Sequence, residues 1–299
     1  MPATTRPAGG DRVLMASVRG RLLRVAVRAA PPGHQDRAVP PLLLCNGIGG
    51  SLELLQPFVD ALGARREVIR FDLPGIGGSP APAVPYHLVT LPGLVTGLLD
   101  ELGHPVADVL GISWGGGLAQ QLALAYPERV RRLVLVATGT GWLMVPARPT
   151  VLRHLLTPRR HRDPGYAVRV AAEIYGGTLR SRPDLARELL HATAATGPRR
   201  GYYYQLLAGA GWTSLPLLPR LRQPTLVLAG DDDPMIPLVN ARLMRAMIPR
   251  ALLRIYPGGH LELIASPQML ARAVEAFLDD GKPEPPRAAS GKAGGHEGG

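Results

Sequence analysis

A serine flanked by glycines is the clearest chemical feature of the sequence. Gly111, Ser113 and Gly115 form a G-x-S-x-G pentapeptide in the order Gly-Ile-Ser-Trp-Gly. An apolar run at 106–112 precedes it, and a helix-length amphipathic segment at 114–126 follows it. This context is typical of a tight strand-to-helix turn that holds a nucleophilic serine in a strained conformation, because glycines remove side chains that would clash. The alternative is a serine that only caps the helix.

His260 is the candidate for the general base that a serine nucleophile needs. Five histidines follow Ser113, and only His260 comes directly after an apolar run, at 252–256, and a glycine turn, Pro257-Gly-Gly259. Loops at the carboxyl ends of strands are where open α/β sheets place their sites. The alternative is an ordinary histidine of a surface loop.

Three consecutive aspartates offer the carboxylate that would orient His260. Asp231, Asp232 and Asp233 follow an apolar run, and the chain order serine, acid, histidine accompanies this type of serine turn. Burying three carboxylates together would be costly, so we expect one of them to serve. We predict Asp233, because Pro234 restricts the backbone at that residue. Asp232 is the main rival.

Two backbone N–H groups are expected to bind the oxyanion of a tetrahedral intermediate. The first belongs to Trp114, directly after the serine. The second belongs to Ile48, in the loop Asn46-Gly-Ile-Gly-Gly50 that follows an apolar run at 42–45. The alternative for this loop is a simple glycine turn.

A second glycine-rich loop, at 72–79, lacks the spacing of a phosphate-binding loop, and no lysine follows it. We interpret it as a structural turn beside the site. The sequence also shows no cluster of histidine, cysteine and aspartate with metal-ligand spacing. We therefore expect neither a metal ion nor a cofactor.

Alternating apolar and amphipathic segments predict an α/β fold, with a mostly parallel sheet and helices on both faces. Two stretches at the start, Val13–Val18 and Leu22–Arg28, predict an antiparallel pair. The other predicted strands are 42–45, 67–71, 106–112, 133–137, 225–229 and 252–256, and the predicted core helices are 52–62, 91–102, 114–126, 238–248 and 267–278.

More than eighty residues separate the strands that end near 138 and start at 225. A structureless loop of that length is uncommon in a compact domain. We therefore predict an inserted helical cap, with helices at 166–175 and 183–193. The predicted division is a flexible lead at 1–11, an α/β core at 12–140 and 221–280, the cap at 141–220 and a disordered tail at 281–299.

The net charge of +11 comes from 34 basic residues, of which only Lys282 and Lys292 are lysine. An anionic partner such as nucleic acid would explain the charge. The arginines are scattered and no nucleic-acid-binding motif accompanies them, so we favour biased codon usage and expect no nucleic acid.

Cys45 is the only cysteine, the start has no apolar secretory region, and the apolar runs are too short to span a bilayer. We expect a cytoplasmic protein without a transmembrane segment.

Several motifs together resemble the α/β-hydrolase superfamily: Asn46-Gly-Ile-Gly49, Phe71-Asp-Leu-Pro-Gly-Ile-Gly-Gly-Ser79, Gly111-Ile-Ser-Trp-Gly-Gly116 and Gly230-Asp-Asp-Asp-Pro-Met-Ile-Pro237. More narrowly, the chain resembles intracellular poly(3-hydroxyalkanoate) depolymerases that act on medium-chain-length polyester. That likeness rests on Ile174-Tyr-Gly-Gly177, on the stretch from Gly201-Tyr-Tyr-Tyr-Gln205 to Ser214, and on Gly259-His-Leu261. It covers residues 13–280 and departs mildly at Gly117, where alanine is expected.

The resemblance implies a serine esterase that forms an acyl-enzyme on Ser113 and releases 3-hydroxyalkanoic acids, with Asp233 and His260 in the roles given above. It also implies association with polyester granules. The predicted substrate contacts are apolar cap side chains, above all Trp142, Met144, Tyr203 and Trp212, with Leu143, Val145, Tyr202 and Tyr204 as further candidates. The alternative is that these side chains form the core of the cap.

Two other functions stay open. The first is a carboxylesterase, thioesterase or 3-hydroxyacyl transferase that uses the same three residues on small acyl substrates. The second is a non-catalytic granule-binding protein, against which the complete set of Ser113, Asp233 and His260 argues, since a binding module would not need all three.

Overall fold

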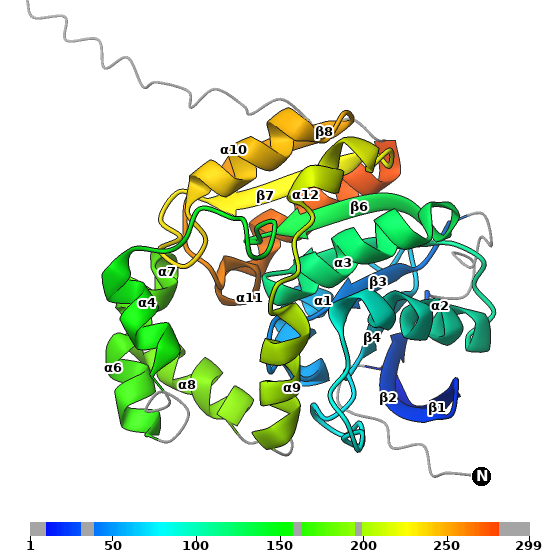
Figure 1. Cartoon of the computed structure of the whole chain (residues 1–299), viewed down its shortest axis with the longest axis horizontal. Coiled ribbons are helices and arrows are strands. Elements are labelled where there is room, and N and C mark those ends of the chain that lie inside the picture. Colours follow the sequence, from blue (N-terminus) through cyan, green and yellow to red (C-terminus); the bar gives the residue numbers. More distant parts are fainter. Residues whose placement is uncertain (1–9, 31–38, 158–162, 195–198, 281–299) are drawn as a thin grey trace, which may run out of the picture.

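The computed structural model in Figure 1 describes residues 10–30, 39–157, 163–194 and 199–280. Among these residues, eight strands form one sheet in the spatial order β1-β2-β4-β3-β5-β6-β7-β8. The strands are β1 (Arg12–Val18), β2 (Arg21–Arg28), β3 (Leu42–Cys45), β4 (Val68–Phe71), β5 (Ala107–Ile112), β6 (Val130–Val136), β7 (Thr225–Gly230) and β8 (Ala251–Tyr256).

Only one edge of the sheet is antiparallel. β1 pairs with β2, and β2 with β4, in antiparallel register, whereas the pairs from β4 to β8 are parallel. The predicted α/β class and the predicted antiparallel pair are confirmed. β6 begins at Val130, whereas we predicted a start at Leu133. The prediction started too late because Arg131 and Arg132 interrupt the apolar pattern. In the sheet, Arg131 donates to the buried carboxylate of Asp108.

Both faces of the sheet are buried, because alternate residues of each strand point to opposite sides. Leu43 and Cys45 pack with α2, α3 and α10, whereas Leu42 and Leu44 pack with α1 and α12. This burial on both faces explains the continuous apolar runs in the sequence. The core helices are α1 (Gln56–Ala61), α2 (Leu91–Glu101), α3 (Trp114–Ala125), α10 (Leu238–Met247), α11 (Glu262–Ala265) and α12 (Pro267–Asp280), with short 3-10 turns η1 (Leu52–Leu55), η2 (Leu88–Thr90) and η3 (Pro127–Arg129).

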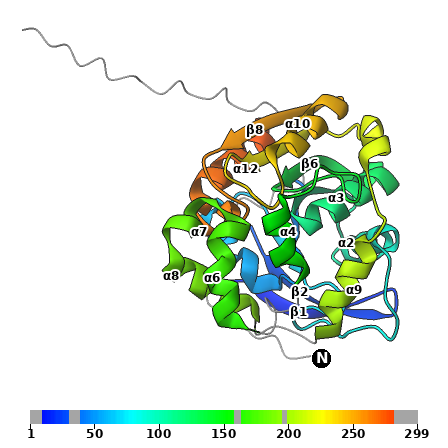
Figure 2. The same ribbon diagram turned by 60° about the vertical axis from the view of Figure 1, so that its left-hand side comes forward.

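Helices fill the interval between β6 and β7. They are α4 (Pro149–Leu156), α6 (Pro164–Tyr175), α7 (Gly177–Ser181), α8 (Pro183–Ala194) and α9 (Arg199–Gly209), followed by the 3-10 turn η4 (Leu215–Arg220). Figures 1 and 2 show α4, α6, α7 and α8 together, with α9 apart from them. The helices predicted at 166–175 and 183–193 lie within α6 and α8. The boundaries of a separate cap at 141–220 stay a prediction.

The predicted lead and tail fall mostly outside the described residues. This holds for 1–9 and for the whole tail, 281–299. Asp11, which we placed in the flexible lead, is buried and accepts a hydrogen bond from Arg70. No helix in the described part of the chain combines the length and the apolar character needed to cross a membrane.

The parallel strands bring four loops to one edge of the sheet. β3, β5, β7 and β8 run in the same direction, so the loops that follow them all leave at the carboxyl-terminal edge. These loops begin at Asn46, Ser113, Asp231 and Pro257. The fold therefore places the predicted nucleophile, acid, base and oxyanion donors at the same edge.

Cys45 offers a chemical test of this packing. Its side chain is fully buried at the end of β3, and burial raises the pKa of the thiol to about 12. Because the thiolate is the reactive form, we expect no reaction of the native protein with iodoacetamide at mildly alkaline pH. In concentrated guanidinium chloride we expect one carboxamidomethyl group per chain, measured by intact-protein mass spectrometry. Rapid labelling without denaturant would contradict the packing of β3.

Candidate active site

Three predicted side chains meet at the carboxyl-terminal edge of the sheet. Nδ1 of His260 lies 2.9 Å from Oδ2 of Asp233, and Nε2 lies 3.0 Å from Oγ of Ser113. Ser113 follows β5, Asp233 follows β7 and His260 follows β8. His260 and Asp233 are buried, whereas Ser113 is partly exposed. Ser113 is thus within hydrogen-bond distance of His260 and partly exposed to solvent.

The backbone at Ser113 is strained, as the pentapeptide predicts. Its φ of 53° and ψ of −122° lie in a region that residues other than glycine rarely adopt. Such a backbone conformation costs about 1–3 kcal/mol. Glycine is required on both sides. A Cβ on Gly111 would lie 2.3 Å from the Gly115 carbonyl oxygen, and a Cβ on Gly115 would lie 2.1 Å from that of Cys45. The Thr138 hydroxyl donates to the Ser113 carbonyl at 2.7 Å and ties the turn to the end of β6.

The three aspartates differ in their hydrogen-bond partners. Oδ2 of Asp233 faces His260, and Oδ1 accepts hydrogen bonds from the backbone N–H groups of residues 235–236, at 2.9 Å each. Asp231 accepts instead from the Gly258 N–H, at 2.9 Å. Only Asp233 therefore contacts the imidazole, while Asp231 holds the turn before it.

Asp232, the rival acid, binds α7 instead of His260. Its carboxylate accepts hydrogen bonds from the Arg180 guanidinium, at 2.9 and 3.2 Å, and from the Gly177 N–H, at 2.8 Å. Burial acts to raise the pKa of this carboxyl, but the hydrogen bonds from Arg180 and Gly177 outweigh burial and lower it. The charge of Asp232 thus anchors α7 to the loop that carries Asp233.

The loop after β3, which contains the predicted oxyanion donor Ile48, lies against Ser113. A Cβ on Gly47 would lie 3.6 Å from the Ser113 Cβ, so this loop contacts the serine directly. Asn46 braces the loop, since its side-chain amide donates to one backbone carbonyl and its Oδ1 accepts from the Gly47 N–H. Within the described residues, the backbone N–H groups of Ile48 and Trp114 have no hydrogen-bond acceptor. Both are available to bind a ligand oxygen.

The predictions from sequence missed the residues that support His260 from outside the sheet. The Tyr175 ring stacks on the imidazole, with ring centroids 6.3 Å apart. The backbone carbonyl of Tyr175 accepts a hydrogen bond of 2.7 Å from the backbone N–H of His260. Gly176 and Gly177 follow with φ of 62° and 49°. A Cβ on Gly177 would lie 2.0 Å from the Gly259 nitrogen. The Tyr-Gly-Gly triplet was the available signal, because only glycine allows this approach.

Glu262 is a second support that the sequence did not reveal. Its carboxylate is buried and accepts hydrogen bonds from the Gly259 N–H at 3.1 Å and from the Thr178 hydroxyl at 2.5 Å. A buried carboxylate needs such donors, because burial without them would be costly. Glu262 thereby joins α7 to the loop that carries His260.

The four predicted substrate contacts lie in different environments. Trp142 is 74% exposed and Tyr203 is 49% exposed, whereas Trp212 is only 7% exposed. The Trp212 indole donates to Gln121 at 2.8 Å and packs in a small apolar cluster, as a core residue would. Met144 is partly buried. Contact of these four side chains with a substrate stays a prediction.

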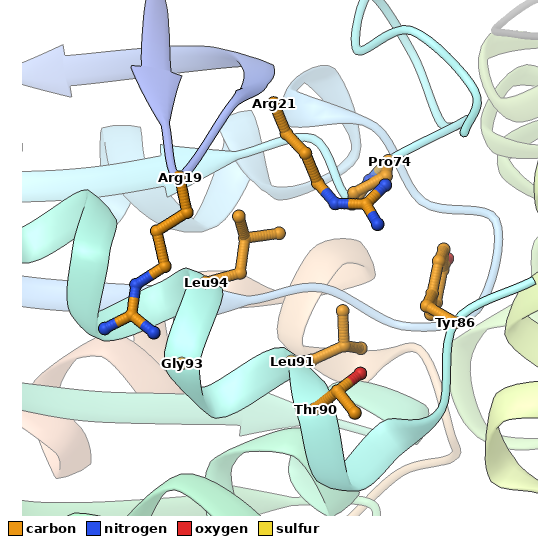
Figure 3. A pocket seen from close by; sticks show the side chains of 8 residues that line it. All are labelled: Arg19, Arg21, Pro74, Tyr86, Thr90, Leu91, Gly93 and Leu94. Atoms are coloured by element: carbon orange, nitrogen blue, oxygen red, sulfur yellow. The ribbon is translucent and has the colours of Figure 1, made fainter. Parts of the chain in front are cut away.

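A small pocket lies away from Ser113, at the turn between β1 and β2 (Figure 3). Its volume is about 160 Å³, and it is lined by Arg19 and Arg21, by Tyr86, and by the start of α2. Burial raises the pKa of the Tyr86 hydroxyl. Neither Ser113 nor its partners line this pocket.

Among the residues that the structure describes, no three histidine, cysteine or acidic side chains are grouped so as to hold a metal ion.

Comparison with known proteins identifies the family. Residues 40–267 match a family model described as alpha/beta hydrolase fold. The chain belongs to the α/β-hydrolase family. The family predicted from the motifs is therefore confirmed.

Individual relatives of this α/β-hydrolase include a poly(3-hydroxyalkanoate) depolymerase from Ectopseudomonas oleovorans, 48% identical over 273 residues, which cover 90% of this chain and 94% of the relative. A solved hydrolase from Pseudomonas aeruginosa PA01 has a TM-score of 0.73 at 30% identity, covering 91% of this chain and 100% of that one. An enol-lactonase from Burkholderia xenovorans LB400 has a TM-score of 0.74 at 25% identity, covering 89% and 99%. These similarities confirm the narrower resemblance and support the prediction of an ester hydrolase.

Proposed function

We propose that this α/β-hydrolase cleaves the ester bonds of medium-chain-length poly(3-hydroxyalkanoate), with Ser113 as nucleophile, His260 as base and Asp233 as the orienting acid. The observation that carries the chemistry is the continuous hydrogen-bond path from Ser113 through His260 to Asp233. The substrate rests on the similarity to the depolymerase of Ectopseudomonas oleovorans. Location in the cytoplasm, at polyester granules, belongs to the same proposal.

The hydrogen bonds define the proton positions before reaction. A carboxylate only accepts, so His260 donates its Nδ1 hydrogen to Asp233, and Nε2 accepts from the Ser113 hydroxyl. Oγ attacks an ester carbonyl of the polymer while Nε2 takes its proton, and the Asp233 charge stabilises the imidazolium. The N–H groups of Ile48 and Trp114 bind the oxyanion that forms.

Collapse of this intermediate breaks the ester bond. The 3-hydroxyl oxygen of the departing chain leaves with the proton from Nε2 of His260, and the acyl group stays on Ser113. A water molecule then gives a proton to Nε2 and attacks the acyl-enzyme through a second oxyanion. Release of a 3-hydroxyalkanoic acid restores the Ser113 hydroxyl.

Exposed apolar side chains favour a water-insoluble substrate. They lie on α9 and on the segment after β6 and form what we term the apolar surface: Trp142, Leu143, Val145, Tyr203, Leu206 and Leu207. The segment after β6 lies next to the residues that follow α9, since Gly141 pairs with Thr213 and the Trp142 N–H donates to the Trp212 carbonyl at 2.7 Å. Grouped exposed apolar residues mark binding surfaces, and a polymer granule presents an apolar partner.

Acid release from purified medium-chain-length polyester granules tests the nucleophile and the substrate together. We expect the native protein to release 3-hydroxy acids, measured by chromatography. Ser113→Ala lacks the attacking oxygen, so we expect its turnover to fall by about 10⁶-fold. Binding of Ser113→Ala to granules should persist, because the serine makes no part of the apolar surface.

Two other outcomes would redirect the proposal. If the native protein leaves granules intact but cleaves a soluble octanoate ester, the polymer is wrong and the small-ester alternative holds. If it fails on both and does not react with a fluorophosphonate, the serine chemistry is wrong, and co-sedimentation with granules would then support the non-catalytic granule-binding alternative.

Exchange of single aspartates for asparagine tests the acid. Asp233→Asn removes the charge beside His260 and allows the wrong imidazole tautomer, so we expect kcat on a soluble ester to fall by about 10⁴-fold. Asp232→Asn is the matched control, since that carboxylate pairs with Arg180, and we expect kcat within a few-fold of native. A larger loss in Asp232→Asn than in Asp233→Asn would show that the acid is assigned to the wrong residue.

Polar substitution on α9 tests the apolar surface. We expect Leu206→Ser with Leu207→Ser to lower acid release from granules and co-sedimentation with them about 30-fold. Each leucine is about half exposed, so covering it contributes on the order of 1 kcal/mol, and about 1.4 kcal/mol corresponds to a factor of ten. Activity on a soluble short ester should stay within twofold. Leu22→Ser, an exposed leucine on β2, is the control and should change neither. An equal loss of activity on granules and on the soluble ester would contradict a specific role of the apolar surface in polymer binding.

A further inference from the structure

We propose that Gln205 of α9 is a positioning residue for the oxyanion site, an inference that rests on the proposed function. Its side-chain Oε1 accepts a hydrogen bond of 2.6 Å from the Gly49 N–H, and its backbone carbonyl accepts one of 3.1 Å from the Trp114 indole. Gly49 follows Ile48 in the chain, so one residue contacts both segments that carry the proposed donors.

The contact with Gly49 fixes the orientation of the Ile48 N–H. The peptide unit before it is held by the bond from the Gly47 N–H to Asn46, and the unit after it by the bond from Gly49 to Gln205. The peptide unit that contains the Ile48 N–H also contains the Gly47 carbonyl, and this carbonyl accepts a hydrogen bond from the backbone N–H of Gly50. Three consecutive peptide units are thereby restrained, and only the last restraint comes from outside the loop.

The setting of Gln205 shows that this amide is not an ordinary surface side chain. Gln205 is only 1% exposed, whereas its chain neighbours Leu206 and Leu207 are 46% and 55% exposed. α9 therefore turns the polar side chain of Gln205 inward and the two leucines outward, so it does not pack through apolar burial alone, although Ala208 is also buried. Burial of a glutamine requires a hydrogen-bond partner, and the partner here is the loop beside Ser113.

The packing of α9 leaves little freedom for the loop. Gly49 has a φ of 73°, and a Cβ there would lie 3.2 Å from the Tyr202 ring. On the other side, a Cβ on Gly209 would lie 3.1 Å from the Trp114 indole nitrogen. Because oxyanion donors act most strongly when they are already in position, movement of α9 away from the loop would weaken the transition state more than substrate binding.

Gln205→Met tests the positioning role, because it keeps the length of the side chain and removes the acceptor. We expect kcat on a soluble octanoate ester to fall about tenfold, less than the 10²–10³ that follows loss of an entire donor. KM should stay within twofold. The inhibition constant of an alkyl trifluoromethyl ketone, whose adduct on Ser113 carries an oxyanion, should rise by the same factor as kcat falls.

Arg200→Met is the matched control, since Arg200 also joins α9 to a loop, through a hydrogen bond to the Ala81 carbonyl, but contacts neither the loop after β3 nor Trp114 in the hydrogen bonds of the described residues. We expect native kcat and native ketone inhibition. A merely structural role for Gln205 would give the two variants the same kinetics per active molecule, counted by fluorophosphonate titration, and would overturn the proposal. A raised KM at unchanged kcat would also overturn it, because Gln205 would then act on substrate binding.

Trp114→Phe provides a second route if Gln205→Met does not fold. It removes the indole N–H that donates to Gln205 and leaves the backbone N–H of residue 114 in place. We expect the same pattern, a lower kcat with matched loss of ketone inhibition. Native kinetics in Trp114→Phe would overturn the role of this contact. Failure of the native protein to react with the fluorophosphonate would instead refute the serine chemistry of the proposed function.

Discussion

The close approach of two backbones at Ser113 constrains the whole site. Gly115 lies so near the carbonyls of Cys45 and Asn46 that a Cβ would come within 2.1 and 2.4 Å of their oxygens. The helix after the serine therefore starts against the loop after β3. This contact is possible because β3 and β5 are adjacent and parallel, and in the proposed function it would bring the N–H groups of Ile48 and Trp114 to the same oxyanion. The strand order is thus a condition for the proposed chemistry.

Two separate parts of the interval between β6 and β7 support opposite sides of Ser113. The junction of α6 and α7 holds the imidazole side, through the stacked ring of Tyr175 and the hydrogen bonds of Glu262 and Asp232. α9 contacts the loop after β3, which carries the proposed oxyanion donor Ile48, through Gln205. The core supplies Ser113, Asp233 and His260, but their surroundings depend on contacts with residues far away in the chain.

Much of the sheet and of the site could be predicted, because both depend on local pattern. Apolar runs, glycine turns and chain order are sufficient to place Ser113 and His260 at one edge. The choice among three adjacent aspartates is different in kind, since Asp232 and Asp233 have the same chemistry and differ only in partners. The decisive partner of Asp232 is Arg180, which lies far from it in the sequence.

α9 escaped prediction for a physical reason. Helix signals assume that apolar residues face inward, but here Gln205 is buried while Leu206 and Leu207 are exposed.

Trp212 and Gly117 show a related limit of prediction from sequence. A Cβ on Gly117 would lie 3.0 Å from the Trp212 ring, so the missing methyl group and the large ring compensate each other across the fold. An aromatic residue of the core and one of a binding surface look identical in a sequence.

The arrangement of α9 couples substrate choice to catalysis in the proposed function. Its outer side carries Leu206 and Leu207 of the apolar surface, and its inner side carries Gln205 against the loop beside Ser113. A helix is stiff over this length, so a change that shifts one side also shifts the other. Replacement of α9 to accept a different ester would therefore alter the oxyanion geometry as well, unless the acceptor for the Gly49 N–H were kept. Displacement of the whole helix would change specificity and rate together, whereas a change confined to the outer side chains leaves the contact of Gln205 with Gly49 intact.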